Sequence, residues 1–419
     1  MICRLVLENY KAFASRTEID FCANRNIKRL DYNYVGVNGK HILKTVGVYG
    51  PNNVGKSCLL GAFHALRSLM LNKNRENLEN VFLTQSGTTS FEVEYMIHNR
   101  FYVYSLDYDN KNKAYLSEKL LLRTYSSNSS KSDILFDKNG DKLHWVDMPR
   151  NLKNGKIKGL FSSSFPFMMM FNDDDNALMK QAKEDYVAFA ESISFIKMDN
   201  DVPMSKTLDL LRNNEKAARF IKEFVKNCDL HIDDFGLNEV FESDIDIETP
   251  LEIAMKDPSF SKERLKLFSR HNGYKVPSVL FDSLGTMKLV ALAGYIFEAL
   301  NGGNILVVDE IDSSLHHLLT KSIIAMFSNL LNDKSQLLFS THDILLLDTR
   351  SLLRKDQIYL VDVVDAASSG LTRLSFFTSR SDKGIRGDED IKEYYLKGHF
   401  GHIPSPDLFS SLEEAIGDE

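Results

Sequence analysis

The sequence predicts an α/β protein with a parallel central sheet, and the main observation is the order of apolar patterns at two distant places in the chain. A nearly continuous apolar run, Ile42–Tyr49, leads through a glycine-rich turn into a helical repeat over Lys56–Leu71. Much later, the apolar run Ile305–Val308 is followed by an amphipathic helix at Leu315–Leu331 and another apolar run at Gln336–Ser340. Strand–helix–strand order implies parallel strands, and continuous apolar runs are typical of strands covered on both faces.

Antiparallel strands are expected alongside this core in residues 1–124. Arg4–Glu8 and Thr17–Phe21 alternate as strands, and Phe91–Ile97 and Phe101–Asp107 form a predicted hairpin. The sheet is therefore expected to be mixed.

Residues 125–278 differ in character and are expected to form a mostly helical insertion. They begin with a polar stretch, Ser126–Asp133, and an acidic loop, Asp173–Asp175, after which helical periodicity dominates. Residues 279–365 return to alternating helix and strand, and residues 366–419 are left as a C-terminal tail.

Composition excludes several classes of protein. The chain has 419 residues, 43% of them apolar and 26% charged, with 51 Lys+Arg against 58 Asp+Glu and a net charge of −7. This balance is typical of a globular protein of two or three domains and does not favour wholesale coating of nucleic acid. We find no membrane-spanning run or secretory signal, and the four cysteines are scattered without a metal-ligand pattern, so a cytoplasmic location is expected.

The glycine-rich turn carries a nucleotide-binding motif. The run Gly50-Pro-Asn-Asn-Val-Gly55-Lys56-Ser57 matches G-x-x-x-x-G-K-[ST] between a predicted strand and a predicted helix. The two glycines let successive N–H groups point at phosphate oxygens, Lys56 is expected to reach the β- and γ-phosphates, and the Ser57 hydroxyl is expected to bind Mg²⁺. The alternative is a glycine turn that precedes Lys-Ser by accident. The expected nucleotide-binding residues here are Gly50, Pro51, Asn52, Asn53, Gly55, Lys56, Ser57 and Cys58.

Two adjacent carboxylates, Asp309 and Glu310, follow the apolar run at 305–308. Ligands bind at the carboxyl ends of parallel strands, so Asp309 is expected to hold Mg²⁺ through water and Glu310 to polarise the attacking water. Burying two adjacent acids is costly unless a cation or a catalytic role retains them.

Two weaker motifs accompany this pair. His342 follows the run Gln336–Ser340, which should neighbour the Asp309 strand, and there it could sense the γ-phosphate; a histidine that merely caps a strand is the alternative. The second motif, at the start of a predicted helix, would form a phosphate-binding nest without a lysine, although any helix N-cap looks similar. Its residues are Ser283, Gly285 and Thr286. Lys56, Glu310 and His342 are the expected catalytic residues.

Taken in order, the motifs resemble an ABC-type ATPase head of the soluble branch that includes RecF, the SMC proteins and the OLD-type ATPases. Leu5–Phe13 resembles the opening strand of that branch, and Asp309–His316 resembles its Walker B motif and D-loop. Ser283–Thr286 stands where the ABC signature falls, with Leu284 in place of the glycine of transporters. Gln85 lies where a Q-loop glutamine would fall, though a surface glutamine is the favoured interpretation.

A closer resemblance is to the RloA/AbiL-type ATPases of bacterial defence (abortive infection) loci. Those proteins carry similar tails, here Gly384–Asp390 and Tyr395–Pro404. Tyr394 and Tyr395 are interpreted as a docked tail, with a partner-binding role as the alternative.

The resemblance implies an ABC-type head with a parallel P-loop core, an antiparallel β subdomain and an inserted helical lobe. It also implies that ATP and Mg²⁺ are sandwiched between two copies, so that the signature of one completes the P-loop site of the other. The function implied is an ATP-driven switch or scaffold in antiphage defence with a separate effector, such as a Toprim-like nuclease. Alternatives are a RecF-like DNA-repair ATPase that binds duplex DNA directly and an interaction module that binds ATP without hydrolysing it.

Overall fold

The structure is a computed structural model. It describes residues 1–73, 78, 87–126, 129–148, 163–172, 176–198, 203–228, 230–238, 266–365, 368–377 and 391–401. Every structural statement below concerns these residues.

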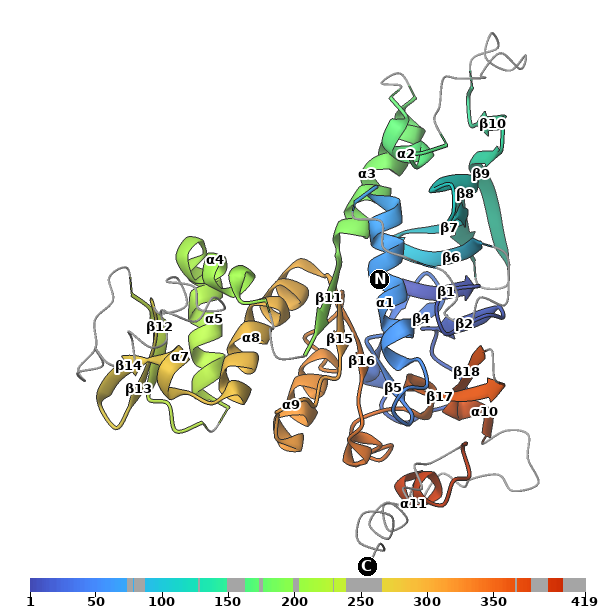
Figure 1. The fold of residues 1–419 in the computed structure, drawn as a ribbon. Coiled ribbons are helices and arrows are strands. Elements are labelled where there is room, and N and C mark those ends of the chain that lie inside the picture. The colour runs from blue at the N-terminus through green and yellow to red at the C-terminus, as the bar shows by residue number, and fades with distance from the viewer. Residues whose placement is uncertain are drawn as a thin grey trace, which may run out of the picture.

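A six-stranded sheet forms the centre of the described chain (Figure 1). Five strands are parallel and the last runs antiparallel to its neighbour. The order is β11 (Ile193–Lys197), β15 (Ile305–Asp309), β16 (Gln336–Ser340), β5 (Thr45–Tyr49), β17 (Ile358–Asp365) and β18 (Ser368–Arg373). Every residue of β5, β15 and β16 is buried, which explains their continuous apolar runs. The predicted parallel α/β core, with the 305 and 336 strands side by side, is confirmed.

Helices cover both faces of this sheet. Helix α1 (Lys56–Met70) covers one face, and α8 (Leu284–Gly302) and α9 (His317–Phe327) cover the other. The apolar stripe of α1 packs into one hydrophobic core with strands of the second sheet, so this helix is buried between the two sheets.

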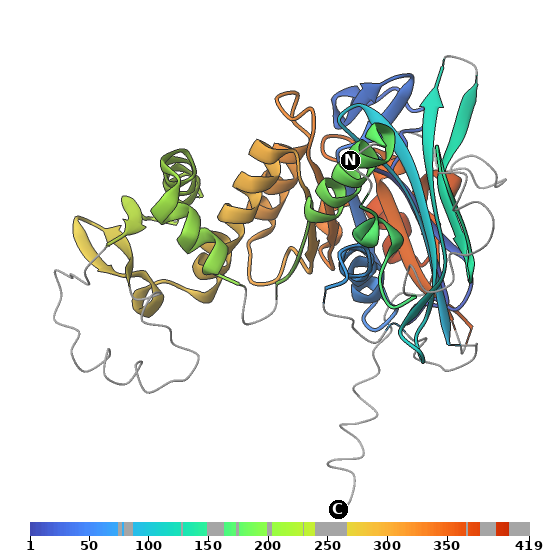
Figure 2. The ribbon, with the colours of Figure 1, turned by 90° about the horizontal axis from the view of Figure 1, so that it is seen from above.

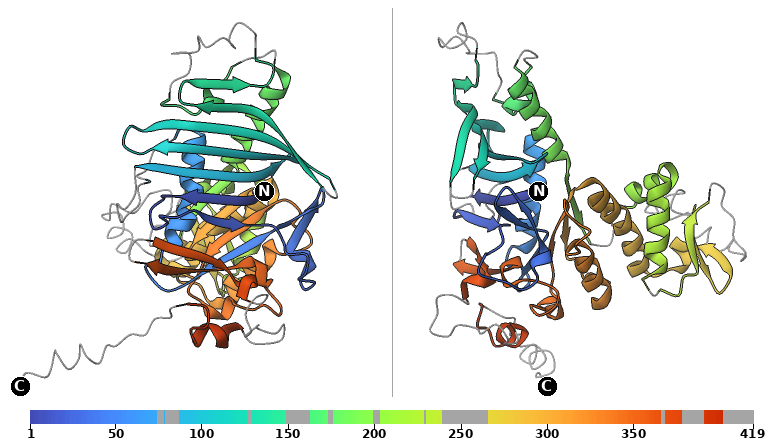
Figure 3. Two further views of the ribbon diagram at one scale, coloured as in Figure 1. Left: turned by 90° about the vertical axis from the view of Figure 1, so that its right-hand side faces the viewer. Right: turned by 180° about the vertical axis from the view of Figure 1, so that it is seen from behind.

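The second sheet is antiparallel and has seven strands within the described ranges; it faces the viewer in the left panel of Figure 3. Its order is β10 (Lys142–Trp145), β9 (Ser130–Asn139), β8 (Ala114–Tyr125), β7 (Arg100–Asp109), β6 (Thr88–Ile97), β1 (Ile2–Glu8) and β2 (Thr17–Asp20). The predicted hairpin of β6 and β7 is confirmed, and it turns at His98 and Asn99, both in the left-handed region with φ of 46° and 60°.

The apolar run at 42–49 is two strands rather than one, which corrects the prediction of a single strand. Strand β4 (Lys40–Leu43) pairs with β3 (Tyr34–Val37) in a separate hairpin, and the chain enters the central sheet only at Thr45. The buried residue between them, Lys44, donates its Nζ to the Asn329 carbonyl 2.9 Å away. An apolar pattern does not show at which residue a strand changes sheets.

The range 125–278 contributes to three parts of the fold. Strands β9 and β10, with helices α2 (Phe167–Met170) and α3 (Ala177–Glu191), extend the antiparallel part, and β11 is an edge of the central sheet. These strands differ from the expected helical character. In β9 the first five residues are exposed and four of them are polar, so this strand lacks the long apolar run of a central strand. The acidic loop 173–175 lies outside the described residues.

A small lobe stands beside α8 on the side away from the antiparallel sheet (Figure 2). Helices α4 (Ser205–Asn213) and α5 (Glu215–Lys226) pack on α8. Beyond them lies a sheet of three described strands, β12 (Asp234–Leu237), β13 (Leu267–His271) and β14 (Tyr274–Pro277), followed by the short helix α7 (Ser278–Phe281).

The described part of the C-terminal tail packs back against the core of the central sheet. After α10 (Leu374–Phe377), the described segment 391–401 contains α11 (Ile391–Leu396). Tyr394 and Tyr395 pack against the core that includes β17, and Phe400 is buried, which confirms the predicted docked tail. Short 3-10 turns occur at Asp31–Asn33, Ile344–Leu346 and Lys355–Gln357.

Candidate nucleotide-binding site

The glycine turn leaves β5 at Tyr49 and enters α1 at Lys56, as the sequence predicts. Gly50 and Gly55 have φ of 153° and 103°, values that residues with a side chain rarely adopt. Space is also restricted, because a Cβ on Gly50 would lie 2.4 Å from the Val361 carbonyl oxygen. Conformation and crowding together explain why glycine occupies both positions.

Lys56 lies almost fully buried at the start of α1, with 6% of its surface exposed. Its Nζ donates to the carbonyl oxygens of Gly50, at 2.9 Å, and Pro51, at 2.6 Å. Burial lowers the pKa of the ammonium from 10.5 to about 8, although the nearby carboxylates of Asp309, Glu310 and Asp312 act in the opposite direction. A desolvated cation that donates to neutral carbonyl oxygens is well suited to an anionic ligand.

The carboxylate of Asp309 is fully buried at the end of β15. One oxygen, Oδ1, accepts a hydrogen bond from the Ser340 hydroxyl at 2.6 Å. The other, Oδ2, has no hydrogen-bond partner among the described residues. Buried polar atoms are nearly always paired, so this oxygen marks a place for a ligand.

Glu310 has a strained backbone, with φ of 56°. Its N–H donates to the Ser340 Oγ at 2.8 Å, so one hydroxyl at the end of β16 fixes both acidic residues. Ser340 was not singled out from the sequence, because serine at the end of a strand is common. Its role is visible only once the two strands are paired.

His342 follows β16 and is exposed on the same edge of the sheet. Its backbone N–H donates to the Asp312 Oδ2 at 3.3 Å. Partial desolvation, together with the charge of Lys56, lowers the pKa of the imidazole below its usual 6.5, so the ring is neutral at pH 7. The charges of Lys56, Asp309 and Glu310 also act on this ring, so the four predicted groups gather at one site.

The residues fit a magnesium ion that is shared with phosphate oxygens. No group of three His, Cys, Asp or Glu side chains that could hold a metal occurs in the described part of the chain. Mg²⁺ commonly uses one or two protein oxygens and completes its shell with water and substrate phosphates. The unpaired Asp309 Oδ2 and the exposed Ser57 at the start of α1 supply oxygens of this kind.

The comparisons with known proteins bear on the same region. A family model described as "AAA domain, putative AbiEii toxin, Type IV TA system" matches residues 46–348. The chain belongs to this family. The match begins in β5 and ends beyond His342, so it includes the P-loop, the Asp309–Glu310 pair and the strands between them.

The chain is also similar to two solved SMC heads. One is the SMC head domain from Thermotoga maritima, with 13% identity, coverage of 89% of this chain and 98% of that chain, and a TM-score of 0.40. The other is an SMC head bound to the C-winged helix domain of ScpA, with 14% identity, coverage of 88% and 97%, and a TM-score of 0.48. No curated protein matches the sequence.

The predicted signature segment, Ser283–Thr286, lies at the start of α8. Ser283 caps the helix, with its Oγ accepting from the Thr286 N–H at 3.1 Å and lying 3.0 Å from the Thr286 Oγ1. A Cβ on Gly285 would lie 2.5 Å from the Ser314 carbonyl oxygen, so the backbone of the predicted signature packs against the predicted D-loop of its own chain. Helix α8 covers the face of the sheet opposite α1, so the structure does not bring these residues to the P-loop as it does Asp309, Glu310 and His342.

Lys288, one turn into α8, was missed in the sequence. It is 3% exposed, and its Nζ donates to the Met198 carbonyl at 2.9 Å and to the hydroxyls of Ser313 and Ser314 at 3.1 and 3.3 Å. The Lys288 side chain therefore ties α8 to the loop after β15 and to the residue that follows β11. A lysine in a helical apolar stripe is the only sequence signal for such a role.

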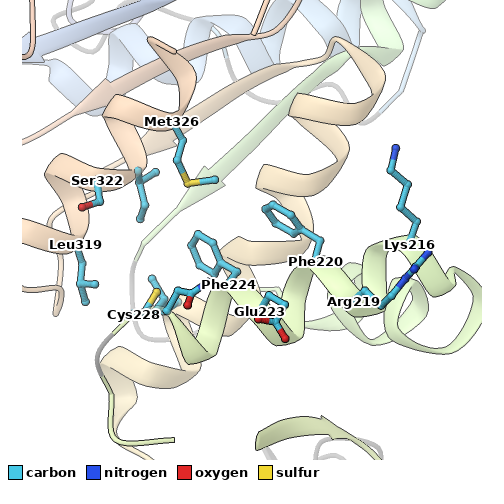
Figure 4. A pocket seen from close by; sticks show the side chains of 12 residues that line it. Lys216, Arg219, Phe220, Glu223, Phe224, Cys228, Leu319, Ser322 and Met326 are labelled. Atoms are coloured by element: carbon cyan, nitrogen blue, oxygen red, sulfur yellow. The ribbon is translucent and has the colours of Figure 1, made fainter. Parts of the chain in front are cut away.

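A largely apolar cavity of about 640 Å³ lies away from the P-loop, between Phe220 and Phe224 of α5 and Leu319 and Met326 of α9 (Figure 4). No described helix is long and apolar enough to cross a membrane. Gln85 and the tail motif 384–390 lie outside the described residues.

Proposed function

We propose that the protein binds ATP with Mg²⁺ and hydrolyses it at an interface shared by two copies. The observation that carries this proposal is the meeting of Lys56, Asp309 and Glu310 at the carboxyl ends of β5 and β15, which are separated only by β16. Phosphoryl transfer needs groups of these kinds. Lys56 is a buried cation that can bind phosphate, Asp309 offers an unpaired carboxylate oxygen to a metal ion, and Glu310 is an acid that can accept a proton from water.

Each residue takes a defined part in this proposal. The backbone of residues 50–58 holds the phosphates, and Lys56 exchanges its bonds to Gly50 and Pro51 for the β- and γ-phosphate oxygens. Ser57 and Asp309 hold Mg²⁺, which when bound offsets the negative charge of the phosphates. Glu310 accepts a proton from the attacking water, and neutral His342 offers a hydrogen bond to the γ-phosphate.

A second copy completes the site. Ser283 and Leu284 are exposed at the start of α8, and the hydrogen bonds of Ser283 stay within its own turn. The segment is therefore accessible to the triphosphate of another copy, to which Ser283, Gly285 and Thr286 would present a hydroxyl and helix N–H groups.

The proposed role is an ATP-dependent switch or scaffold of the RloA/AbiL type in bacterial defence, working in the cytoplasm with a separate effector such as a nuclease. The family description supports this direction because it names a toxin–antitoxin system. In this role ATP occupancy would set the assembly state, and hydrolysis would reset it.

The first test replaces Glu310 by Gln and measures phosphate release, ATP affinity and molar mass with and without ATP. We expect release to fall by about two orders of magnitude, since a general base contributes 10²–10⁴-fold, while ATP is retained and the dimer accumulates. A variant that releases phosphate at the wild-type rate would remove Glu310 from the role of base.

The shared site is tested by mixing two inactive variants, Lys56→Ala and Ser283→Arg. A mixed dimer contains one intact P-loop opposite one intact signature. The 1:1 mixture should recover about a quarter of the wild-type rate, because half of randomly paired dimers are mixed and each holds one complete site. No recovery, with mixed dimers shown to form, would contradict the shared interface.

A further inference from the structure

A histidine of the lobe reaches the residue that immediately precedes the signature serine. His271, at the end of β13, donates its Nε2–H to the Asp282 Oδ1 at 2.9 Å. Asp282 is followed directly by Ser283, the N-cap of α8. A side chain of the lobe sheet therefore binds the residue that leads into the signature turn.

Asp282 is a buried anchor next to an exposed turn. Its side chain is 3% exposed, whereas Leu284 is 50% exposed. The second carboxylate oxygen accepts from the Ser278 hydroxyl, and the Asp282 N–H donates to the Ser278 carbonyl at 2.8 Å. Because a carboxylate held on both oxygens has little freedom, the backbone that leads into Ser283 is fixed in direction.

The ring of His271 also contacts the His231 backbone and Ser269 of its own strand. Its Nδ1 lies 3.1 Å from the His231 carbonyl oxygen, and Nε2 also lies 3.1 Å from the Ser269 hydroxyl. The His231 backbone is in the left-handed region, with φ of 55°. The lobe thus orients the ring from both nitrogens, as expected of a group that must keep another side chain in place.

We propose that His271 is a positioning residue for hydrolysis: through Asp282 it directs Ser283 toward the triphosphate bound by the P-loop of another copy. This inference rests on the proposed shared ATP site. It gives the lobe a function, because the hydrogen bond from His271 to Asp282 joins its small sheet to the signature turn. His271 is not one of the residues assigned to the phosphates or to the attacking water, so it acts on the rate through the placement of Ser283.

The first test compares His271→Gln with His271→Asn. The amide nitrogen of Gln is as many bonds from Cβ as Nε2 of histidine, so Gln keeps the donor to Asp282, whereas the nitrogen of Asn is one bond too short. We expect Asn to lower kcat by about tenfold or more, since small misplacements of a positioned group are costly, and Gln to recover most of it. The Kd of ATP should stay unchanged in both, because the P-loop of the same chain sets it.

Arg270→Ala is the matched control on the same strand. The Arg270 guanidinium donates to the Gly273 carbonyl at 2.7 Å in the hairpin turn, away from Asp282, so its loss should leave kcat unchanged. Equal losses of rate in Arg270→Ala and His271→Asn would show a general effect on the lobe and would overturn the positioning role.

The deciding test mixes His271→Asn with Lys56→Ala. In a mixed dimer, the intact P-loop of the His271→Asn chain faces the undamaged signature of the Lys56→Ala chain. Adding an inactive protein should therefore raise the rate to about a quarter of the wild-type value, by the same pairing arithmetic as above. A defect in folding or in the P-loop of the same chain would give the opposite result, since the inactive chain would only dilute the activity.

The two failures are distinguishable. If Lys56→Ala and Ser283→Arg do not complement each other, the shared site itself is wrong. If they do, and His271→Asn either hydrolyses ATP at the wild-type rate or is not rescued by Lys56→Ala, the role of His271 is overturned and the proposed function stands.

Discussion

The lowered pKa of Lys56 predicts that ATP affinity falls as pH rises through a range where an ordinary lysine would not respond. The ammonium binds phosphate and the neutral amine does not. With a pKa of about 8 in the free protein, the ammonium is the major form at pH 7 and the minor form at pH 9. Bound phosphates supply negative charge, which returns the pKa to its usual value or above.

The size of the effect follows from that difference. The apparent Kd should rise about tenfold between pH 7 and pH 9, because the fraction of ammonium falls from about nine tenths to about one tenth. A lysine with a pKa near 10.5 would give almost no change over this range. Binding at pH 9 should also take up a proton, which calorimetry in buffers of different ionisation enthalpy would measure directly.

Lys56→Arg is the control for this prediction. The guanidinium keeps its charge throughout this range, so whatever affinity remains should be independent of pH between 7 and 9. If wild-type affinity stays constant, or if Lys56→Arg shows the same tenfold loss, the reasoning from a desolvated ammonium is wrong.

Two further substitutions test the packing and the support of the site. Gly294→Ala should destabilise the protein by about 1–3 kcal/mol in urea unfolding, because the new Cβ would lie 2.9 Å from the Thr207 Cα. Gly61→Ala is the matched control within another helix. Its new Cβ would have its nearest neighbour at 3.4 Å, so this substitution should stabilise the protein by about 0.5–1 kcal/mol. If both substitutions changed the free energy of unfolding in the same direction, the close contact of α4 and α8 would be contradicted. Ser340→Ala should lower phosphate release about tenfold and spare ATP binding, since it removes the donor to Asp309; loss of binding instead would show that Ser340 supports the P-loop.

The sequence predicted those parts of the site that are encoded locally. The glycine turn, its strand and its helix lie within 26 consecutive residues, Thr45–Met70, and each has its own pattern. Asp309 and Glu310 were found in the same way, because a short apolar strand ends in two acids. The proximity of these two places followed from the rule that parallel strands bind ligands at their carboxyl ends.

What the sequence did not show depends on pairing between distant segments. Ser340 and Lys288 became meaningful only when their partners from other strands were in place. Strand β11 was missed because it is a short edge strand in which only Ile193 and Ile196 are buried, and the change of sheet at Lys44 leaves no mark in an apolar run. Local sequence patterns identify helices and strands. Which of these elements lie side by side is decided by hydrogen bonds between segments that are distant in the sequence.

The order of the central strands has a consequence for synthesis of the protein on the ribosome. Thr45 of β5 pairs with Leu337 on one side, and Gly47 pairs with Ile358 on the other. While the first three hundred residues emerge, the strand that carries the phosphate turn has neither of these neighbours and exposes two unpaired edges. The nascent chain thus cannot assemble its ATP site early, and we expect protection of this strand by chaperones to limit the yield of active protein.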